Sequence, residues 1–152
     1  MLLFSFTLIT SCLEIFEPEE DADASILGKW ELVRVEESAK TVAPATDTIQ
    51  VWIEFKETVI KPEHQTFAPN YNLFGENLTN LYFSLASFDS KKRKGDLTVN
   101  SIGSTRRGGP EAYLTFDSYY LEKLNKASSY TINDDTLVIN TTEGDMLVYR
   151  RY

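Results

Sequence analysis

One segment of this sequence, residues 111–126, has the spacing of an amphipathic helix, and it constrains the possible folds more than any other feature. Its apolar side chains recur three or four residues apart and form a single stripe: Tyr113, Phe116, Tyr120, Leu121 and Leu124. The other apolar segments are short, and they do not alternate with further helical patterns as the βαβ units of a parallel sheet do. Because one helix cannot cover both faces of a large sheet, we predict an α+β fold. In it, a curved antiparallel sheet, a half-barrel, packs around this helix.

The strands of that sheet are predicted from short apolar runs and from alternation. Residues 49–56 alternate apolar and polar side chains, with only Trp52 out of phase, and this pattern is typical of a half-buried antiparallel strand. After the helix, two short polar turns separate three apolar runs and predict a terminal three-stranded meander. The predicted strands are 30–35, 49–56, 71–75, 81–88, 97–102, 130–132, 137–140 and 146–150.

The first eleven residues carry no charge and are apolar or hydroxylic. They are too few to cross a bilayer as a helix, but their number fits the apolar region of a signal peptide. The run ends in Leu8-Ile9-Thr10-Ser11-Cys12, which resembles a bacterial lipobox. The resemblance implies cleavage after Ser11 and acylation of Cys12, for example by palmitate. No Lys or Arg precedes the run, unlike most signal peptides, and the alternative is a core strand over residues 1–16 with Cys12 as a buried thiol.

Much of the net charge of -8 belongs to one short segment. Residues 13–25 hold six acids and no base, and subtracting these from the 23 acids leaves 17 against 15 bases. We interpret residues 1–11 as a signal peptide, 12–25 as a lipidated cysteine with an acidic tether, and 26–152 as the folded domain. The acids after Cys12 resemble the export signal of some surface lipoproteins, so a periplasmic and a surface-exposed position on the cell membrane or outer membrane both stay open. The acidic balance argues against nucleic acid as a partner.

Residue types that commonly carry catalysis or bind metals are scarce. One cysteine and one histidine cannot build a disulfide framework, and they leave little with which to build a Cys/His zinc site or a thiol–imidazole pair. His64 stands in a Pro-flanked segment without a nucleophile motif and is interpreted as a loop histidine. The acids Asp134, Asp135, Glu143 and Asp145 fall at predicted turns, and turn chemistry explains them. We expect no catalytic residue, metal or cofactor.

Basic side chains gather at two places in the sequence. The candidate contacts for an anionic ligand are Lys91, Lys92, Arg93, Lys94, Arg106 and Arg107. Lysine and arginine pair well with phosphate, as in lipid or lipopolysaccharide headgroups. The alternative for residues 91–94 is a solvated charged turn that discourages pairing at a sheet edge.

Several segments, in this order, resemble the META domain, also called HslJ-like, which occurs on many bacterial lipoproteins. The segments are Leu27-Gly28-Lys29-Trp30-Glu31-Leu32, Ile102-Gly103-Ser104-Thr105-Arg106, Tyr120-Leu121-Glu122-Lys123-Leu124, Ser129-Tyr130-Thr131-Ile132, Asp135-Thr136-Leu137-Val138-Ile139 and Gly144-Asp145-Met146-Leu147-Val148-Tyr149-Arg150. The resemblance covers residues 26–152. It implies a β-rich α+β fold without enzyme activity, and roles in envelope stress tolerance, secretion or motility.

Two positions depart from the pattern of this family. The family often has cysteines in a Gly-Cys-Asn segment and in a Thr-Arg-x-x-Cys segment, and Thr79 and Gly109 stand at those positions here. If the family's two cysteines are bridged, this domain lacks a stabilisation of about 2–4 kcal/mol.

We therefore expect a non-enzymatic, monomeric, lipid-anchored protein of the cell envelope that binds another envelope component, a protein partner. The alternative is a lipocalin-like carrier of a small hydrophobic ligand, suggested by Gly28-Lys29-Trp30 and by the 8 Tyr, 9 Phe and 2 Trp of the chain. The interior distinguishes the two. Side chains of Phe116, Tyr120 and Leu124 that fill the concave face of the sheet would exclude a carrier, whereas an open apolar cavity would favour one.

Overall fold

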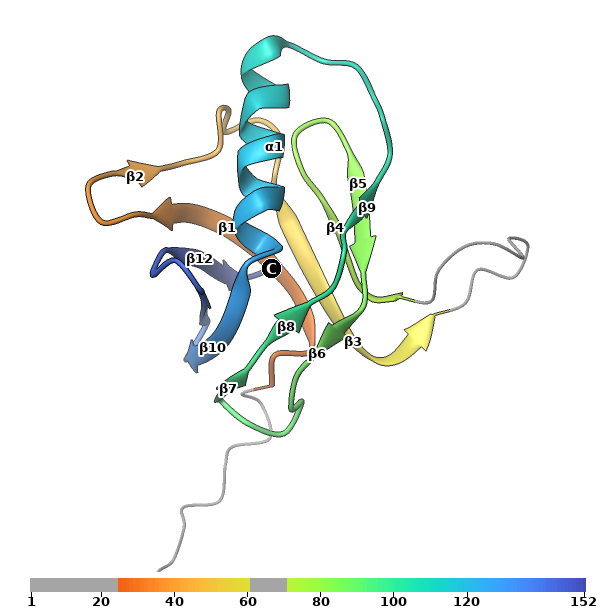
Figure 1. The fold of residues 1–152 in the computed structure, drawn as a ribbon, viewed down its shortest axis with the longest axis vertical. Helices are drawn as coiled ribbons and strands as arrows, with labels where there is room; N and C mark the ends of the chain where they lie inside the picture. Colours follow the sequence, from red (N-terminus) through yellow and green to blue (C-terminus); the bar gives the residue numbers. More distant parts are fainter. Residues whose placement is uncertain (1–24, 61–70) are drawn as a thin grey trace, which may run out of the picture.

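The computed structural model describes residues 25–60 and 71–152, except for the side chains of residues 59 and 60. These residues form one helix, α1 (Glu111–Leu124), and short strands (Figure 1). The strands are β1 (Gly28–Glu36), β2 (Thr41–Val42), β3 (Trp52–Ile60), β4 (Tyr71–Glu76), β5 (Leu81–Ser84), β6 (Ala86–Ser87), β7 (Lys94–Asp96), β8 (Thr98–Val99), β9 (Gly103–Ser104), β10 (Ala127–Asn133), β11 (Thr136–Thr141) and β12 (Met146–Arg151).

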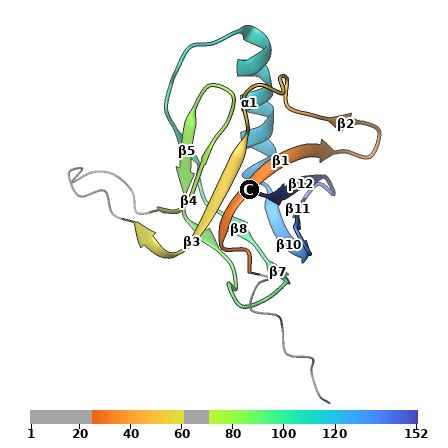
Figure 2. The same ribbon diagram turned by 180° about the vertical axis from the view of Figure 1, so that it is seen from behind.

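The main sheet has the strand order β7-β10-β11-β12-β1-β3-β4-β5-β9, with β2 beside β1, while β6 and β8 form a separate pair. All of these pairings are antiparallel. The two opposite views in Figures 1 and 2 show that the sheet curls strongly, with α1 on its concave side. The predicted half-barrel around one helix is confirmed, and β10, β11 and β12 form the predicted meander.

The apolar stripe of α1 fills the concave side of the sheet. Phe116, Tyr120 and Leu124 are buried, and the rings of Phe116 and Tyr120 stack with their centroids 6.3 Å apart. Fully burying an apolar side chain of this size stabilises the fold by about 1.5–3 kcal/mol. The sheet contributes further buried side chains to the same core: Trp30, Leu32, Ile53, Phe55, Leu73, Leu137, Ile139, Leu147 and Tyr149.

Three buried tyrosines bring their hydroxyl groups together inside this core. The oxygen of Tyr120 lies 2.7 Å from that of Tyr82 and 3.1 Å from that of Tyr149. Tyr82 also donates to the carbonyl oxygen of Trp52 over 2.9 Å. Burial raises the pKa of all three phenols well above the usual value. The hydroxyls therefore stay neutral and satisfy one another in a dry environment.

Several strands differ from their predicted bounds. The predicted strand 97–102 is wrong in extent, because the structure has only β8 at Thr98–Val99 and a separate β9 that begins at Gly103. β3 begins at Trp52 instead of residue 49, and Val51, Ile53 and Phe55 are buried, which leaves Trp52 on the outer face. The predicted strand 81–88 is divided into β5 and β6 at Leu85. There the side-chain amide of Asn72 donates to the carbonyl of Ala86 over 2.9 Å and accepts its N–H over 2.7 Å. These bonds replace regular pairing between strands.

Some sequence predictions fall outside the described residues. These are the signal peptide over 1–11, the lipidation of Cys12, the core-strand alternative over 1–16, and the interpretation of His64 as a loop histidine.

Candidate functional site

The concave side of the sheet is occupied by Phe116, Tyr120 and Leu124, which are 6%, 0% and 0% exposed. A lipocalin-like carrier would hold its ligand in this space. Because the helix occupies it, the arrangement excludes such a carrier. Candidate binding features among the described residues therefore have to be sought on the outer surface.

A hollow of about 310 Å³ opens on the outer face beside β1, at the lower end of the volumes of ligand pockets. A β-bulge between Leu32 and Arg34 shifts the register of β1 against β12 at this point. Such bulges re-aim side chains and are common next to functional sites. Val33, within the bulge, is 37% exposed and faces the hollow together with Ile49, which is 36% exposed.

The lining of this hollow combines an apolar surface with a few polar groups. Val33, Pro44 and Ile49 supply apolar contacts, and Glu31, Asp47 and Arg150 supply charges. The Nε atom of Arg150 donates to a carboxylate oxygen of Glu31 over 2.8 Å, and this bond raises the pKa of Arg150. Because Glu31 and Arg150 pair with each other and Asp47 adds a further polar group, the arrangement suits non-covalent recognition of an apolar group with polar edges.

A row of aromatic rings crosses the outer face next to this hollow: Tyr152, Trp52, Phe74, Tyr71 and Phe83. The Nζ atom of Lys29 lies 3.6 Å from the ring centroid of Tyr152 and 4.0 Å from that of Trp52. The rings of Trp52 and Phe74 are 5.5 Å apart. The row meets the hollow where Tyr152 donates from its hydroxyl to the side chain of Gln50 over 2.7 Å. Contacts of this kind across neighbouring strands stabilise a sheet.

The structure separates the basic residues singled out in the sequence. Lys91, Lys92 and Arg93 precede β7, and Lys94 begins it, at one end of the domain (Figure 1). Arg106 and Arg107 lie in the segment that joins β9 to α1, towards the opposite end. The six side chains therefore do not form one cluster. Anion binding at residues 91–94 stays a prediction.

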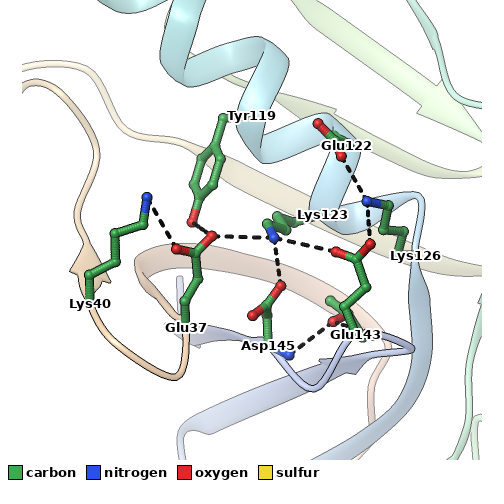
Figure 3. Close-up of polar contacts among 9 residues, drawn as sticks. Glu37, Lys40, Tyr119, Glu122, Lys123, Lys126, Glu143 and Asp145 are labelled. Atoms are coloured by element: carbon green, nitrogen blue, oxygen red, sulfur yellow. Dashed lines mark hydrogen bonds and ion pairs between the residues drawn. The ribbon is translucent and has the colours of Figure 1, made fainter.

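Two acids that the sequence assigns to a turn also form ion pairs with Lys123 of α1 and with Lys126, two residues after the end of α1 (Figure 3). The Nζ atom of Lys123 lies 2.6 Å from a carboxylate oxygen of Asp145 and 3.2 Å from one of Glu37. Lys126 lies 2.7 Å from Glu143. These pairs join the helix to the β11–β12 turn and to the end of β1. The bond to Asp145 is the main cause that raises the pKa of Lys123, so this ammonium keeps its charge at physiological pH.

Tyr119 completes the same network. Its hydroxyl donates to a carboxylate oxygen of Glu37 over 3.0 Å. Burial and this carboxylate together raise the pKa of Tyr119 to about 12. The network has a structural role, because its charges are paired with one another and it connects three separate segments.

Asp117 is a structurally important residue that the apolar spacing of residues 111–126 does not single out. Its carboxylate is 3% exposed and accepts the backbone N–H groups of Leu78 and Thr79, each over 2.8 Å. The hydroxyl of Thr79 donates to it over 2.5 Å. Asp117 therefore fixes the β4–β5 turn to α1. A signal was present, because Asp117 stands four residues after Tyr113 and three before Tyr120, on the apolar stripe.

Residues 25–60 and 71–152 contain neither a metal-binding cluster nor a membrane-spanning helix. No three His, Cys, Asp or Glu side chains there come together as a metal site. The helix of this part of the chain is not long and apolar enough to cross a membrane.

The fold and the order of its elements agree with one family of small domains. The model of that family, described as the META domain, matches residues 24–152. The chain belongs to the META domain family. No curated protein matches the chain in sequence.

Two solved structures are similar to this META domain in fold. One is described as the NMR structure of the protein from Burkholderia xenovorans; it is 12% identical, with a TM-score of 0.62, and the match covers 97% of this chain and 99% of the other. The second is also an NMR structure, 15% identical with a TM-score of 0.53, and the match covers 85% of this chain and 92% of the other. These likenesses support the half-barrel fold.

Thr79 and Gly109, which replace cysteines often found in the family, are neighbours in space. A Cβ atom at position 109 would lie 3.6 Å from the Cβ atom of Thr79, within the range of disulfide-bonded cysteines. Gly109 does not have a positive φ angle, so its backbone accepts a side chain. The site is compatible with the cysteine pair that the family resemblance implied.

We expect a Thr79→Cys/Gly109→Cys variant, made in a Cys12→Ser background, to form a disulfide. Closing a loop of about 30 residues stabilises a fold by about 3.5 kcal/mol. The lost hydroxyl bond from Thr79 to Asp117 removes about 1 kcal/mol of this. Urea unfolding should therefore show a net gain of about 2.5 kcal/mol in the oxidised variant over the Cys12→Ser protein that keeps Thr79 and Gly109. Cysteines that stay reduced under oxidising conditions would show that the two positions are not adjacent.

Proposed function

We propose that this META domain is the folded part of a non-enzymatic, lipid-anchored protein of the cell envelope, and that it acts by binding another envelope component on its outer surface. The observation that carries the proposal is the occupied interior. Phe116, Tyr120 and Leu124 fill the concave face, so recognition has to use the outside of the half-barrel. The same observation counts against the lipocalin-like carrier.

The lipid anchor is supported by the sequence before the domain. Cys12 is the single cysteine of the chain, it ends an uncharged segment, and residues 13–25 carry six acids. An apolar segment followed by a charged, solvated one suits a signal peptide and a tether. We place the acylated Cys12 in the cell membrane or the outer membrane, with the domain in the periplasm or on the surface.

We assign the contact for the partner to the hollow beside β1, where the β-bulge exposes Val33. It presents Val33 and Ile49 to solvent in a recess that also contains a paired arginine and glutamate. Protein interfaces commonly place such apolar groups at the centre of a contact and polar groups around it. We propose that the domain is a monomer and that it binds another protein of the cell envelope through this hollow. The complex would act in stress tolerance or secretion.

Both parts of the proposal are tested with one set of cell-based variants. A photo-crosslinking amino acid is placed at Val33 in the chain with Cys12 intact and in the Cys12→Ala variant. With Cys12 intact, we expect the protein in the membrane fraction and a discrete crosslinked product with an envelope protein. Cys12→Ala should move the protein to the soluble fraction without changing its thermal unfolding, because Cys12 precedes the domain.

Leu114 offers a matched control, since it is 38% exposed against 37% for Val33 but does not line the hollow. The crosslinker at Leu114 should give no discrete product. Equal products from both positions would show unspecific contact and reject the hollow as the binding site. A Cys12→Ala protein that stays in the membrane fraction would reject the lipid anchor.

A further inference from the structure

The chain enters the domain directly beside the basic residues 91–94. Ser25 is the first described residue, and its hydroxyl donates to the carbonyl oxygen of Ser90 over 2.7 Å. A terminal guanidinium nitrogen of Arg151 donates a hydrogen bond to the carbonyl oxygen of Ser25 over 3.2 Å. These bonds fix the point from which the preceding residues leave the domain. Any anchor attached before Ser25 is therefore connected to the domain at the end that carries the β6–β7 loop.

The β6–β7 loop presents lysines to solvent at this end. Lys91, Lys92 and Lys94 are exposed. Among the described residues, no acid forms an ion pair with Lys91 or Lys94, whereas the Nζ atom of Lys92 lies 3.2 Å from a carboxylate oxygen of Asp89. Asp96 of β7 and Glu57, 3.5 Å from the hydroxyl of Ser90, add negative charge nearby. Within the part of the chain that the structure describes, the four basic side chains of residues 91–94 thus stand against three acids, Asp89, Asp96 and Glu57, and Lys91 and Lys94 contribute the lysine charges that form no ion pair.

The length of chain between Cys12 and Ser25 limits how far this end of the domain can lie from the bilayer. The thirteen peptide units from Cys12 to Ser25 span at most about 45 Å when fully extended, so a lipid on Cys12 keeps the entry point of the domain within that distance of the bilayer surface. A polybasic patch is a common second membrane contact of lipid-anchored proteins. Each lysine near an anionic surface strengthens binding about fivefold.

We propose that Lys91, Lys92 and Lys94 contact the phosphate-bearing headgroups of the membrane in which Cys12 is anchored. The inference rests on the lipid anchor of the proposed function. The end with β7 then faces the bilayer, and the end with Arg106, Arg107 and the start of α1 faces away from it (Figure 1). The lysines thus set the orientation of the domain, while the acyl chain supplies most of the affinity.

The test measures partition of the full, unlipidated chain into phosphatidylcholine vesicles with and without phosphatidylglycerol. The ratio of the two partition coefficients removes the contribution of the apolar residues 1–11. We expect Lys91→Gln and Lys94→Gln each to lower this ratio about fivefold. Lys92→Gln should lower it less, because Asp89 already offsets part of its charge. Inorganic phosphate at constant ionic strength should leave the ratio unchanged, since the site is a surface and not a phosphate pocket.

Lys40 is a matched control for Lys92: both side chains are 60% exposed, and each pairs with an acid three residues earlier. Lys40→Gln and Arg107→Gln should leave the ratio unchanged. Equal losses from all these variants, or none from the loop lysines, would overturn the inference. The inference would also be overturned if the ratio rose on replacement of the six tether acids by amides but did not change on replacement of Lys91, Lys92 or Lys94. Fractionation of the Cys12→Ala variant tests the lipid anchor separately. The anchor can therefore be correct even if the vesicle experiment shows no contact between the lysines and the membrane.

Discussion

Replacing Gly75 by alanine is expected to prevent the domain from folding. An added Cβ atom would lie 2.2 Å from Cζ of Tyr82 and 2.5 Å from the carbonyl oxygen of Trp52. The second of these is backbone of a paired strand and cannot rotate away. Tyr82 is fully buried and is held by hydrogen bonds to Tyr120 and Trp52. Relief therefore requires β4 to move away from both β3 and β5.

Overpacking in a tight core costs about 1–3 kcal/mol when side chains can adjust. Here the backbone has to adjust as well, so we expect Gly75→Ala to lose more than about 4 kcal/mol, measured by urea or thermal unfolding. Gly108→Ala is the matched control, because nothing lies within 4 Å of its added Cβ atom. Its unfolding midpoint should stay close to that of the unchanged protein. A normal midpoint for Gly75→Ala would contradict the register of β4 with β3 and β5.

Replacing Asp117 by alanine is the second change with a large expected effect. The carboxylate accepts two backbone N–H groups and the hydroxyl of Thr79. Its removal leaves donors of the β4–β5 turn without a partner in a buried place. An unsatisfied buried polar group costs about 1–3 kcal/mol, so we expect a loss of about 4 kcal/mol in the free energy of unfolding.

Urea unfolding of Asp117→Ala and Asp117→Asn measures this effect. Asp117→Asn keeps one carbonyl oxygen as an acceptor, but its amide NH2 group then faces a backbone N–H group. Its free energy of unfolding should lie between those of Asp117→Ala and the unchanged protein. Ser118→Ala is a control from the same turn of α1, where the exposed hydroxyl of Ser118 donates only to the carbonyl of Leu114. A loss below about 1 kcal/mol for Asp117→Ala would show that the turn is held by other contacts.

The sequence by itself determined those parts of the fold that depend on neighbouring residues. The apolar spacing of residues 111–126 predicted α1, and alternation with turn residues predicted the meander of β10, β11 and β12. One helix and many short strands then left the half-barrel as the economical arrangement. These predictions succeed because the period of apolar residues reports directly which side of an element is buried.

Only the tertiary structure decided which distant residues meet. It placed Asp117 under the β4–β5 turn, brought Thr79 beside Gly109, opened the hollow at the bulge of β1, and set residues 91–94 beside Ser25 and away from Arg106 and Arg107. Each of these contacts joins segments that are separated along the chain. Their geometry depends on strand order, register and bulges, which the period of a single segment does not contain.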